Sequence, residues 1–276
     1  MIDVFVIGTA SLDTLHLAGG RTVFTGGGAG LYTALAAHRA GARVGLFAPK
    51  PEPLPEPLRP AAERLLWRGP TISPDRLPRL EIEHHGGGRA TLLAASWGAE
   101  AELLLEQLPP VAAGSAIIHI AALSTAQRQL DFLDQLKRQA ALRQRPPLIS
   151  VGTYARLVYN DAGRVRRLFE LADLFFMNEN EANGLFGSVG QAQTRPNARL
   201  FVTLDAKGAL VIEGGQATFV AGHSAVEVDP TGAGDTFCGA VLAALAQGKS
   251  ALSAAQAAVK LAAQTVSAVG PEALLT

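Results

Sequence analysis

Short runs of apolar residues alternate along this chain with longer segments that have the spacing of amphipathic helices. The apolar runs lie at residues 4–7, 44–47, 116–120, 148–151, 174–177, 200–204 and 209–212. Helical spacing is found at 31–39, 126–142 and 164–171. Gly41 follows the first of these segments, where a glycine commonly ends a helix. Strands that alternate with helices in this way predict an α/β fold whose mostly parallel sheet is covered by helices on both faces.

Two kinds of segment depart from this alternation. Polar and apolar positions alternate within about 12–26 and 80–98 without a following helix, which is typical of antiparallel strands that expose one face. We therefore expect a single α/β domain over residues 1–276, with a small β lid contributed by these two segments. Six prolines crowd residues 49–60, so we expect an irregular connection that leads into a helix at 61–66. A linker between two domains is the alternative interpretation.

The composition narrows the classes of partner. The chain has 276 residues, 48% of them hydrophobic, and its 24 basic residues balance its 24 acidic residues. This apolar content excludes general disorder, and zero net charge lacks the basic excess that binding along a nucleic-acid duplex requires. No run reaches the roughly 18 apolar residues of a membrane span. A single cysteine, Cys238, and an N-terminus without a basic signal region favour a cytoplasmic protein.

The most specific pattern is the string Asp-Pro-Thr-Gly-Ala-Gly-Asp-Thr-Phe at 229–237, followed by small residues with helical spacing at 238–246. Gly232 and Gly234 allow a tight turn that brings backbone N–H groups close to a ligand. A helix that starts there adds free N–H groups and a partial positive charge, so the string predicts a site for a phosphate or a developing anion. The alternative is that Asp235 only caps the helix and the glycines only make the turn.

This string resembles the C-terminal motif of the ribokinase-like (PfkB) carbohydrate kinase family, and it occupies the same place, late in the chain and before a helix. The resemblance implies that Asp235 is the base that takes the proton of the acceptor hydroxyl. It also implies an anion hole for the transferring phosphoryl group, formed by the backbone N–H groups of Gly232, Ala233 and Gly234, with Thr231 on the nucleotide side. Phosphoryl transfer depends mostly on positioning and charge stabilisation, which such a hole supplies.

Two further segments resemble the nucleotide half of the family. Asn178 and Glu181 match its Asn-x-x-Glu motif, which implies that Glu181 binds Mg²⁺ directly or through water. On the residues alone, the pair also fits a helix start. Residues 202–209 resemble a segment that lines the nucleotide site, and its candidate residues are Thr203, Asp205, Lys207 and Gly208. Asp205 stands where the family has glycine, and Lys207 is either a phosphate neighbour or an exposed turn residue.

The acceptor half of the site is expected near the N-terminus. The glycine-rich stretch 26–30 ahead of a helix resembles the first motif of the family, and Asp13 matches the aspartate that grips substrate hydroxyls. The resemblance implies an acceptor site that contains Asp13, Gly27, Gly28, Tyr32 and Arg89. Tyr32 stands where the family has asparagine, so its phenol would narrow the pocket or stack on a ring.

The sequence also predicts the surroundings of several aromatic, histidine and arginine side chains. Arg89, which follows three glycines, is expected to reach an acidic or phosphorylated acceptor from the lid. His84 and His85 fall on alternate faces of a predicted strand, so they are expected at the surface and not as joint metal ligands. Trp67 and Trp97 are expected to pack inside the protein.

The resemblance spans the chain and implies a three-layer α/β/α ribokinase-like fold with a small β lid. The implied activity is that of an ATP-dependent kinase that uses Mg²⁺ and phosphorylates a hydroxyl of a sugar or sugar-like molecule. The alternatives are a nucleoside or inositol kinase of the same fold and a catalytically inactive nucleotide- or sugar-binding protein. Further expectations are a monovalent cation such as K⁺ at Asp229 and the carbonyls near 267–270, and a homodimer through the lid.

Overall fold

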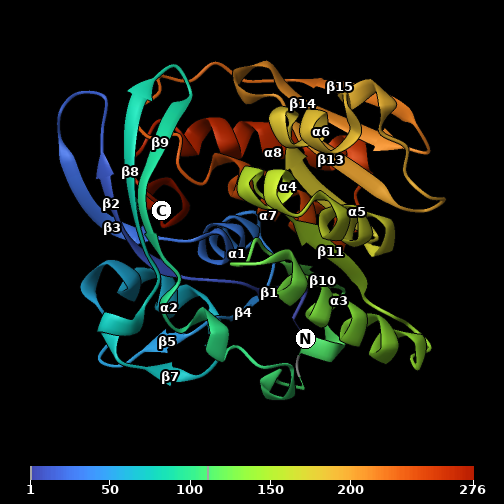
Figure 1. The fold of residues 1–276 in the computed structure, drawn as a ribbon, viewed down its shortest axis with the longest axis horizontal. Helices are drawn as coiled ribbons and strands as arrows, with labels where there is room; N and C mark the ends of the chain where they lie inside the picture. The colour runs from blue at the N-terminus through green and yellow to red at the C-terminus, as the bar shows by residue number, and fades with distance from the viewer. Residues whose placement is uncertain (1, 111) are drawn as a thin grey trace.

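A nine-stranded sheet forms the centre of the fold in the computed structural model, which describes residues 2–110 and 112–276 (Figure 1). Met1 and Val111, which belong to the expected domain 1–276, lie outside the described residues. In spatial order the strands are β15 (Gln216–Ala221), β14 (Gly208–Glu213), β13 (Arg199–Thr203), β12 (Leu174–Asn178), β11 (Leu148–Gly152), β10 (Ile117–Ile120), β1 (Val4–Ile7), β4 (Val44–Phe47) and β6 (Leu66–Arg68). The pairs from β13 to β6 are parallel, whereas β14 runs antiparallel to both of its neighbours.

Helices cover both faces of this sheet. On one face lie α1 (Ala29–Arg39), α7 (Ala233–Ala246) and α8 (Ala251–Thr265), with α2 (Arg59–Arg64) beside α1. On the other lie α3 (Ala126–Ala141), α4 (Ala155–Asn160), α5 (Ala162–Leu171) and α6 (Glu179–Phe186). The two cores follow from the pleat of the strands, because Val4 and Val6 of β1 point into the first core and Phe5 and Ile7 into the second. The predicted three-layer α/β/α fold is confirmed.

A separate four-stranded sheet forms a lid at one side of the molecule (Figure 1). Its order is β3 (Thr22–Gly27), β2 (Ser11–His16), β8 (Arg79–Gly86) and β9 (Arg89–Ser96). The pairs β2–β3 and β8–β9 are antiparallel, and β2 runs parallel to β8. The segments 12–26 and 80–98, which the sequence marks by their alternation, fall on these strands. The edge strand β9 is exposed along its whole length.

Local differences from the predicted elements occur where helices begin. The proline-rich segment forms the short strand β5 (Lys50–Pro51), which pairs with β7 (Thr71–Ile72), before α2 starts. Helix α2 ends at Arg64, so Leu66, expected in this helix, instead begins β6. Helix α7 starts at Ala233, ahead of the expected start at 238, because the turn before it leads directly into the helix. Among the described residues, no helix is long and apolar enough to cross a membrane.

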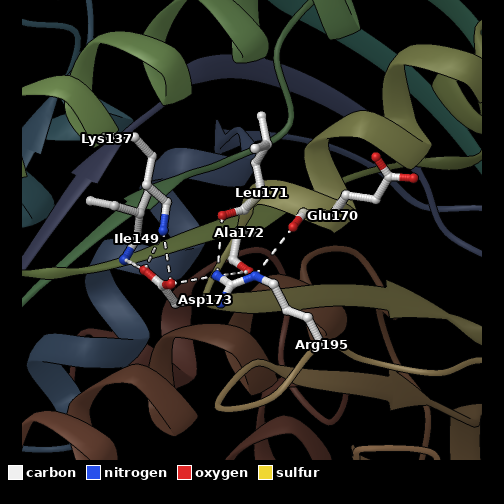
Figure 2. A network of polar contacts seen from close by, with 7 residues as sticks. All are labelled: Lys137, Ile149, Glu170, Leu171, Ala172, Asp173 and Arg195. Atoms are coloured by element: carbon white, nitrogen blue, oxygen red, sulfur yellow. Dashed lines mark hydrogen bonds and ion pairs between the residues drawn. The ribbon is translucent and has the colours of Figure 1, made fainter. Parts of the chain in front are cut away.

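A polar network around Asp173 lies at the amino ends of the central strands β11 and β12 (Figure 2). Asp173, immediately before β12, accepts hydrogen bonds from the Nζ of Lys137 and the N–H of Ile149, both at 2.8 Å. Arg195 donates to Asp173 at 2.6 Å and also to the carbonyl oxygens of Glu170, Leu171 and Ala172. Burial raises the pKa of Asp173, but these hydrogen bonds outweigh it and lower the pKa below its usual value. The charged network therefore ties the two helices α3 and α5 to the sheet.

Candidate active site

A cavity of about 350 Å³ opens at the carboxyl ends of the parallel strands, where side chains of the lid also line it. This is the edge at which open α/β sheets bind ligands. Most of the residues that the sequence singles out line this cavity, namely Asp13, Gly28, Tyr32, Asn178, Glu181, Thr203, Thr231, Gly232, Ala233, Gly234 and Asp235. The remaining candidates lie outside the lining, namely Gly27, Arg89, Asp205, Lys207, Gly208 and Asp229.

The string 229–237 forms a tight turn at the amino end of α7. Gly232 caps the helix with a φ of 73°, a left-handed conformation that residues other than glycine rarely adopt. The first hydrogen bond of the helix runs from the N–H of Thr236 to the carbonyl oxygen of Gly232 at 2.7 Å. The N–H groups before Thr236 therefore have no partner inside the helix, as is usual for a first turn.

These N–H groups are not equally available to a ligand. The N–H of Ala233 donates to the carbonyl oxygen of Pro230 at 3.3 Å, which is a long hydrogen bond. The N–H groups of Gly234 and Asp235 belong to the first turn of α7 and point toward its amino end. A Cβ at Gly234 would meet no atom within 4 Å, so this part of the turn faces open space. The turn is thus suited to an anion at the side of Gly234.

The ring of Tyr32 in α1 lies against this turn. A Cβ at Gly232 would come within 2.3 Å of the ring carbon Cδ1 of Tyr32, so glycine is needed there for space as well as for φ. Tyr32 is 1% exposed, and its hydroxyl has no hydrogen-bond partner among the described residues. Burial raises its pKa well above the usual value, and further increases come from the negative charges of Asp229, Asp13 and Asp235. The hydroxyl therefore stays protonated and can donate a hydrogen bond to a ligand.

Asp13 in β2 brings a carboxyl group to the lid side of the cavity. A Cβ at Gly27 would come within 1.8 Å of Oδ2 of Asp13, so only glycine leaves room for this side chain. Gly28 follows with a φ of 98° and caps α1. Burial raises the pKa of Asp13 to about 7, although the N–H of Leu80 lowers it. Within the described part of the chain its Oδ1 has no hydrogen-bond partner, so a ligand hydroxyl can supply one.

Asn178 and Glu181 form a capping box at the start of α6. The Glu181 N–H donates to Oδ1 of Asn178 at 2.9 Å, and Glu181 accepts from the N–H and the side-chain amide of Asn178 at 2.9 and 2.8 Å. Burial raises the pKa of Glu181 to about 7, although the N–H groups of Asn178 and Ala155 lower it. The alternative prediction of a helix start is therefore confirmed, and the same pair lines the cavity because α6 begins where β12 ends.

Asp235, in the first turn of α7, is a second carboxyl group on this side of the cavity. Burial raises its pKa to about 7, and the negative charge of Glu181 adds to the increase. Two carboxyl groups that repel each other offer the oxygen ligands that Mg²⁺ prefers. No cluster of three or more His, Cys, Asp or Glu side chains suited to a metal occurs in the described residues. A divalent cation here would therefore complete its coordination with phosphate oxygens and water.

The segment assigned to the nucleotide leaves the cavity after Thr203, the last residue of β13. Asp205 then opens a short 3-10 turn with a positive φ of 51°. Lys207 in this turn is exposed, and its Nζ lies 3.5 Å from a carboxylate oxygen of Glu179. Gly208 has a φ of 123°, and a Cβ there would come within 2.0 Å of a carbonyl oxygen of β15. The turn is therefore held by its own contacts at the margin of the cavity.

The expectation that both lid histidines lie at the surface is wrong for His84. His84 is 4% exposed, whereas the next residue, His85, is exposed, because alternate residues of β8 face opposite sides of the lid. The Nε2 of His84 lies 3.2 Å from Oδ1 of Asp229 and 3.1 Å from Oγ1 of Thr231. Arg89, at the start of β9, is exposed and is not among the residues that line the cavity.

Trp97, Tyr154 and His119 line the cavity although none of them was predicted as a ligand contact. Trp97 and Tyr154 have their ring centroids 6.0 Å apart, at an angle of 48°. His119, in β10, lies with Nδ1 2.8 Å from Oγ of Ser150, and burial lowers its pKa to about 3, so the ring is neutral. A signal was available for Tyr154, because it closely follows a predicted strand and so falls at the carboxyl edge. Trp67, in contrast, packs in the core as expected.

Comparison with known proteins agrees with this geometry. A family model described as pfkB family carbohydrate kinase matches residues 71–276. A cytidine kinase of Thermococcus kodakarensis is 28% identical to this chain, and the match covers 90% of each protein. The matched region includes the lid strands β8 and β9 and the whole of the glycine turn before α7.

Solved structures share the fold at lower identity. The adenosine kinase of Sinorhizobium meliloti superimposes with a TM-score of 0.81 at 18% identity, over 98% of this chain and 95% of that one. The ribokinase of Cryptococcus neoformans, solved in complex with ADP, gives a TM-score of 0.79 at 20% identity, over 99% of this chain and 96% of that one. At these identities the likeness concerns the fold.

Proposed function

The chain belongs to the pfkB family of carbohydrate kinases, which transfer a phosphoryl group to a hydroxyl, and on this premise we propose that it phosphorylates a nucleoside with ATP as donor. One observation carries the choice of a nucleoside. The cavity lining combines the unpartnered oxygens of Asp13 and Tyr32, which suit hydroxyl groups, with the aromatic pair Trp97 and Tyr154, which suits a planar base. The cytidine kinase relative supports the same choice.

In this proposal Asp235 accepts the proton of the acceptor hydroxyl. The hydroxyl oxygen then forms a bond to the γ-phosphorus, and the bond from that phosphorus to the bridging oxygen of ADP breaks. A pKa of about 7 suits a general base that works near neutral pH. The N–H groups of Gly234 and Asp235 stabilise the charge that develops on the phosphoryl oxygens, with the amino end of α7 behind them.

The donor is proposed to lie along the opposite half of the cavity, from Gly232 toward Thr203. Asn178, Thr203 and Thr231 line this half, and the turn of Asp205, Lys207 and Gly208 follows directly after Thr203. A Mg²⁺ ion held here by Glu181 through water, and otherwise by phosphate oxygens and further water, would offset the negative charge of the phosphates. Since both oxygens of Glu181 already accept hydrogen bonds from Asn178, Glu181 is the water-mediated ligand.

The monovalent cation expected at Asp229 does not fit the donor set of this structure. Oδ1 of Asp229 accepts the N–H of Thr231 at 2.9 Å and lies 3.2 Å from Nε2 of His84. Oδ2 accepts the N–H of Gly270 at 2.7 Å. Three of the roughly four lone-pair sites of this carboxylate are thus occupied by N–H donors. The positive ends of these N–H groups would repel a cation bound at the same oxygens. No step of the proposed reaction involves such a cation.

The lid also supports the proposal of a homodimer. Phe24 of β3 and Leu93 of β9 are 53% and 50% exposed, on the two edge strands of the lid sheet. Exposed apolar edge strands pair readily with another strand, and a second copy of this chain would cover them. We expect light scattering to give the mass of a dimer, and Leu93→Glu to give that of a monomer. A monomer for the unaltered chain at micromolar concentration would contradict this proposal.

The test of the function is ADP release with ATP and Mg²⁺ against cytidine, adenosine, inosine, ribose and fructose. We expect the highest kcat/KM with a nucleoside, and a loss of at least about 100-fold in kcat for Asp235→Asn, which removes the base and keeps the size of the side chain. The exposed Asp131→Asn in α3 is the matched control and should leave turnover unchanged. Trp97→Ala should raise KM for the nucleoside by about 10-fold or more and leave ribose turnover unaffected. A higher kcat/KM for either bare sugar would refute the nucleoside proposal.

A further inference from the structure

Asp229 lies where three distant segments of the chain meet. It is 1% exposed, and its two oxygens receive donors from its own loop at Thr231, from the lid at His84 and from the C-terminal turn at Gly270. Among the described residues, His84 is the only side chain with a basic nitrogen within ion-pair distance of this carboxylate. Asp229 is thus a junction between the lid and the loop that forms the glycine turn.

The lid contributes one atom to this junction, Nε2 of His84. That nitrogen lies 3.2 Å from Oδ1 of Asp229 and 3.1 Å from Oγ1 of Thr231. A carboxylate oxygen can only accept, so Nε2 carries the hydrogen, and the partners fix the tautomer. Asp229 and Thr231 flank Pro230 and are followed at once by Gly232, whose left-handed conformation shapes the anion site.

Other contacts dock the lid onto the same two segments. At the tip of the β8–β9 hairpin the N–H of Gly88 donates to a carboxylate oxygen of Glu227 at 2.8 Å. A Cβ at Gly270 would come within 2.4 Å of Oγ1 of Thr25 in β3, so the C-terminal turn touches the lid directly. An apolar cluster joins the lid to that turn through Leu15, Leu17 and Val269. The loops expected to hold a monovalent cation are therefore covered by the lid.

The position of the lid also determines where the acceptor binds. Asp13 lies in β2, next to β8, and is paired in register with Leu80 of that strand. Leu80 and Leu92 from the lid line the cavity together with Asp13. A contact that holds β8 in place therefore holds the carboxyl group of Asp13 and the apolar wall of the acceptor end.

We propose that His84 is a positioning residue that latches the lid to Asp229 and does there what a monovalent cation would otherwise do. Its Nε2–H donates to Oδ1 and fills the remaining acceptor position there, and so fixes the 229–231 segment and the Gly232 turn that follows. Two consequences follow for the proposed nucleoside kinase, on whose activity the kinetic part of the test rests. Turnover does not depend on K⁺, and loss of the latch weakens acceptor binding and kcat more than it weakens ATP binding.

The first experiment compares the unaltered enzyme in K⁺ and in tetramethylammonium at equal ionic strength. We expect kcat/KM for the acceptor to differ by less than about two-fold between the two salts. A loss of about 10-fold or more without K⁺ would overturn the proposal. The midpoint of thermal unfolding is measured in both salts as well. It should not differ between them, because a folded-state cation site would raise it in K⁺. This second readout needs no turnover, so it remains decisive if no acceptor is phosphorylated and the proposed function fails.

The second experiment compares three variants of the lid strand. His84→Leu fills the space without a donor and should lower acceptor kcat/KM by about 10- to 100-fold, with a change in KM for ATP below about three-fold. His84→Gln retains a side-chain N–H and should recover most of this loss. The matched control is His85→Leu on the exposed face of the same strand, which should behave as the unaltered enzyme. Equal kinetics for the His84→Leu variant and the unaltered enzyme would overturn the latch.

Hydrogen exchange separates the latch from a general loss of folding. In the His84→Leu variant, amide exchange should speed up at Thr231 and Gly270, whose N–H groups donate to Asp229. Exchange at Ile149, whose N–H donates to Asp173 on the far edge of the sheet, should stay unchanged. Faster exchange at all three amides would assign His84 to overall stability and reject a positioning role.

Discussion

The carboxyl group of Asp13 links the acceptor site to the pH dependence of stability. Asp13 is 1% exposed, and burial raises its pKa from 3.8 to about 7. Between these two values the folded protein holds a proton that the unfolded chain has released. The stability from this proton is present at low pH and is lost as the pH rises through the folded pKa. Asparagine at this position, being uncharged, removes the loss.

The size of this loss of stability follows from the part of the Asp13 pKa shift that lies between pH 5 and pH 8. From pH 5 to pH 8, Asp13 in the folded protein passes through its pKa of about 7, whereas in the unfolded chain it is already ionised. Between pH 5 and the folded pKa of about 7, a span of about 2 pH units, the free energy of unfolding falls by 1.36 kcal/mol per unit, which is about 2.7 kcal/mol in total. The free energy of unfolding of the Asp13→Asn variant should therefore fall by about 2.7 kcal/mol less than that of the unaltered protein.

Urea unfolding at pH 5 and pH 8 measures this difference, because comparing two pH values removes the constant effect of the substitution. The control is Asp75→Asn, an exposed carboxyl whose pKa is lowered by its hydrogen bond from Ser73, so that it titrates below the range used. At pH 8, above the pKa of Asp13, the same Asp13→Asn variant should also raise KM for the acceptor by about 10-fold or more, because the charged acceptor of the substrate hydroxyls is gone. Parallel pH profiles for the variant and the unaltered protein would refute the reasoning.

Two other substitutions test the glycine turn and the far edge of the sheet. Gly232→Ala places a Cβ 2.3 Å from the ring of Tyr32 in a left-handed conformation that alone costs about 1–2 kcal/mol, so we expect kcat to fall by about 10-fold or more. Tyr32→Ala in the same chain removes the clash, so in thermal unfolding the double variant should lose less stability than the two single variants together, and additive losses would exclude the clash. Asp173→Asn breaks the charged network with Lys137 and Arg195, so urea unfolding should show a loss of about 2–3 kcal/mol. Its kcat should remain that of the unaltered enzyme, and a fall would connect this edge to catalysis.

Local spacing predicted the elements well wherever short-range contacts set them. The apolar run 4–7 is strand β1, and Gly41 ends α1 with a φ of 90°. The helix expected at 61–66 was placed too late, because Pro60 starts a helix efficiently and the chain must reach β6 at Leu66 to pair with β4. Pairing with a distant strand is not visible in the local pattern.

In the candidate site, too, the sequence predicted local features and did not predict contacts between distant segments. Asn178 and Glu181 could be interpreted as a helix start or as part of a site, and the structure gives them the capping box and the cavity together. His84 and His85 were known to face opposite sides of a strand, but the sequence did not say that one side is closed by Asp229. Trp97 was assigned to packing as a lone tryptophan, and only the tertiary structure brings its ring to that of Tyr154.

Spacing over a few residues was enough to establish the alternation of strands and helices and the glycine turn that leads into α7, since backbone conformation and the pleat depend on near neighbours. The resemblance of the motifs was enough to identify a kinase. The contacts between distant segments were decided by how whole elements pack. Helix α1 against the turn before α7 brings Tyr32 to Gly232, β2 beside β3 brings Asp13 to Gly27, and the lid against the 229–231 loop brings His84 to Asp229. Such contacts depend on where whole elements lie in space, and the residues that make them carry no common local pattern.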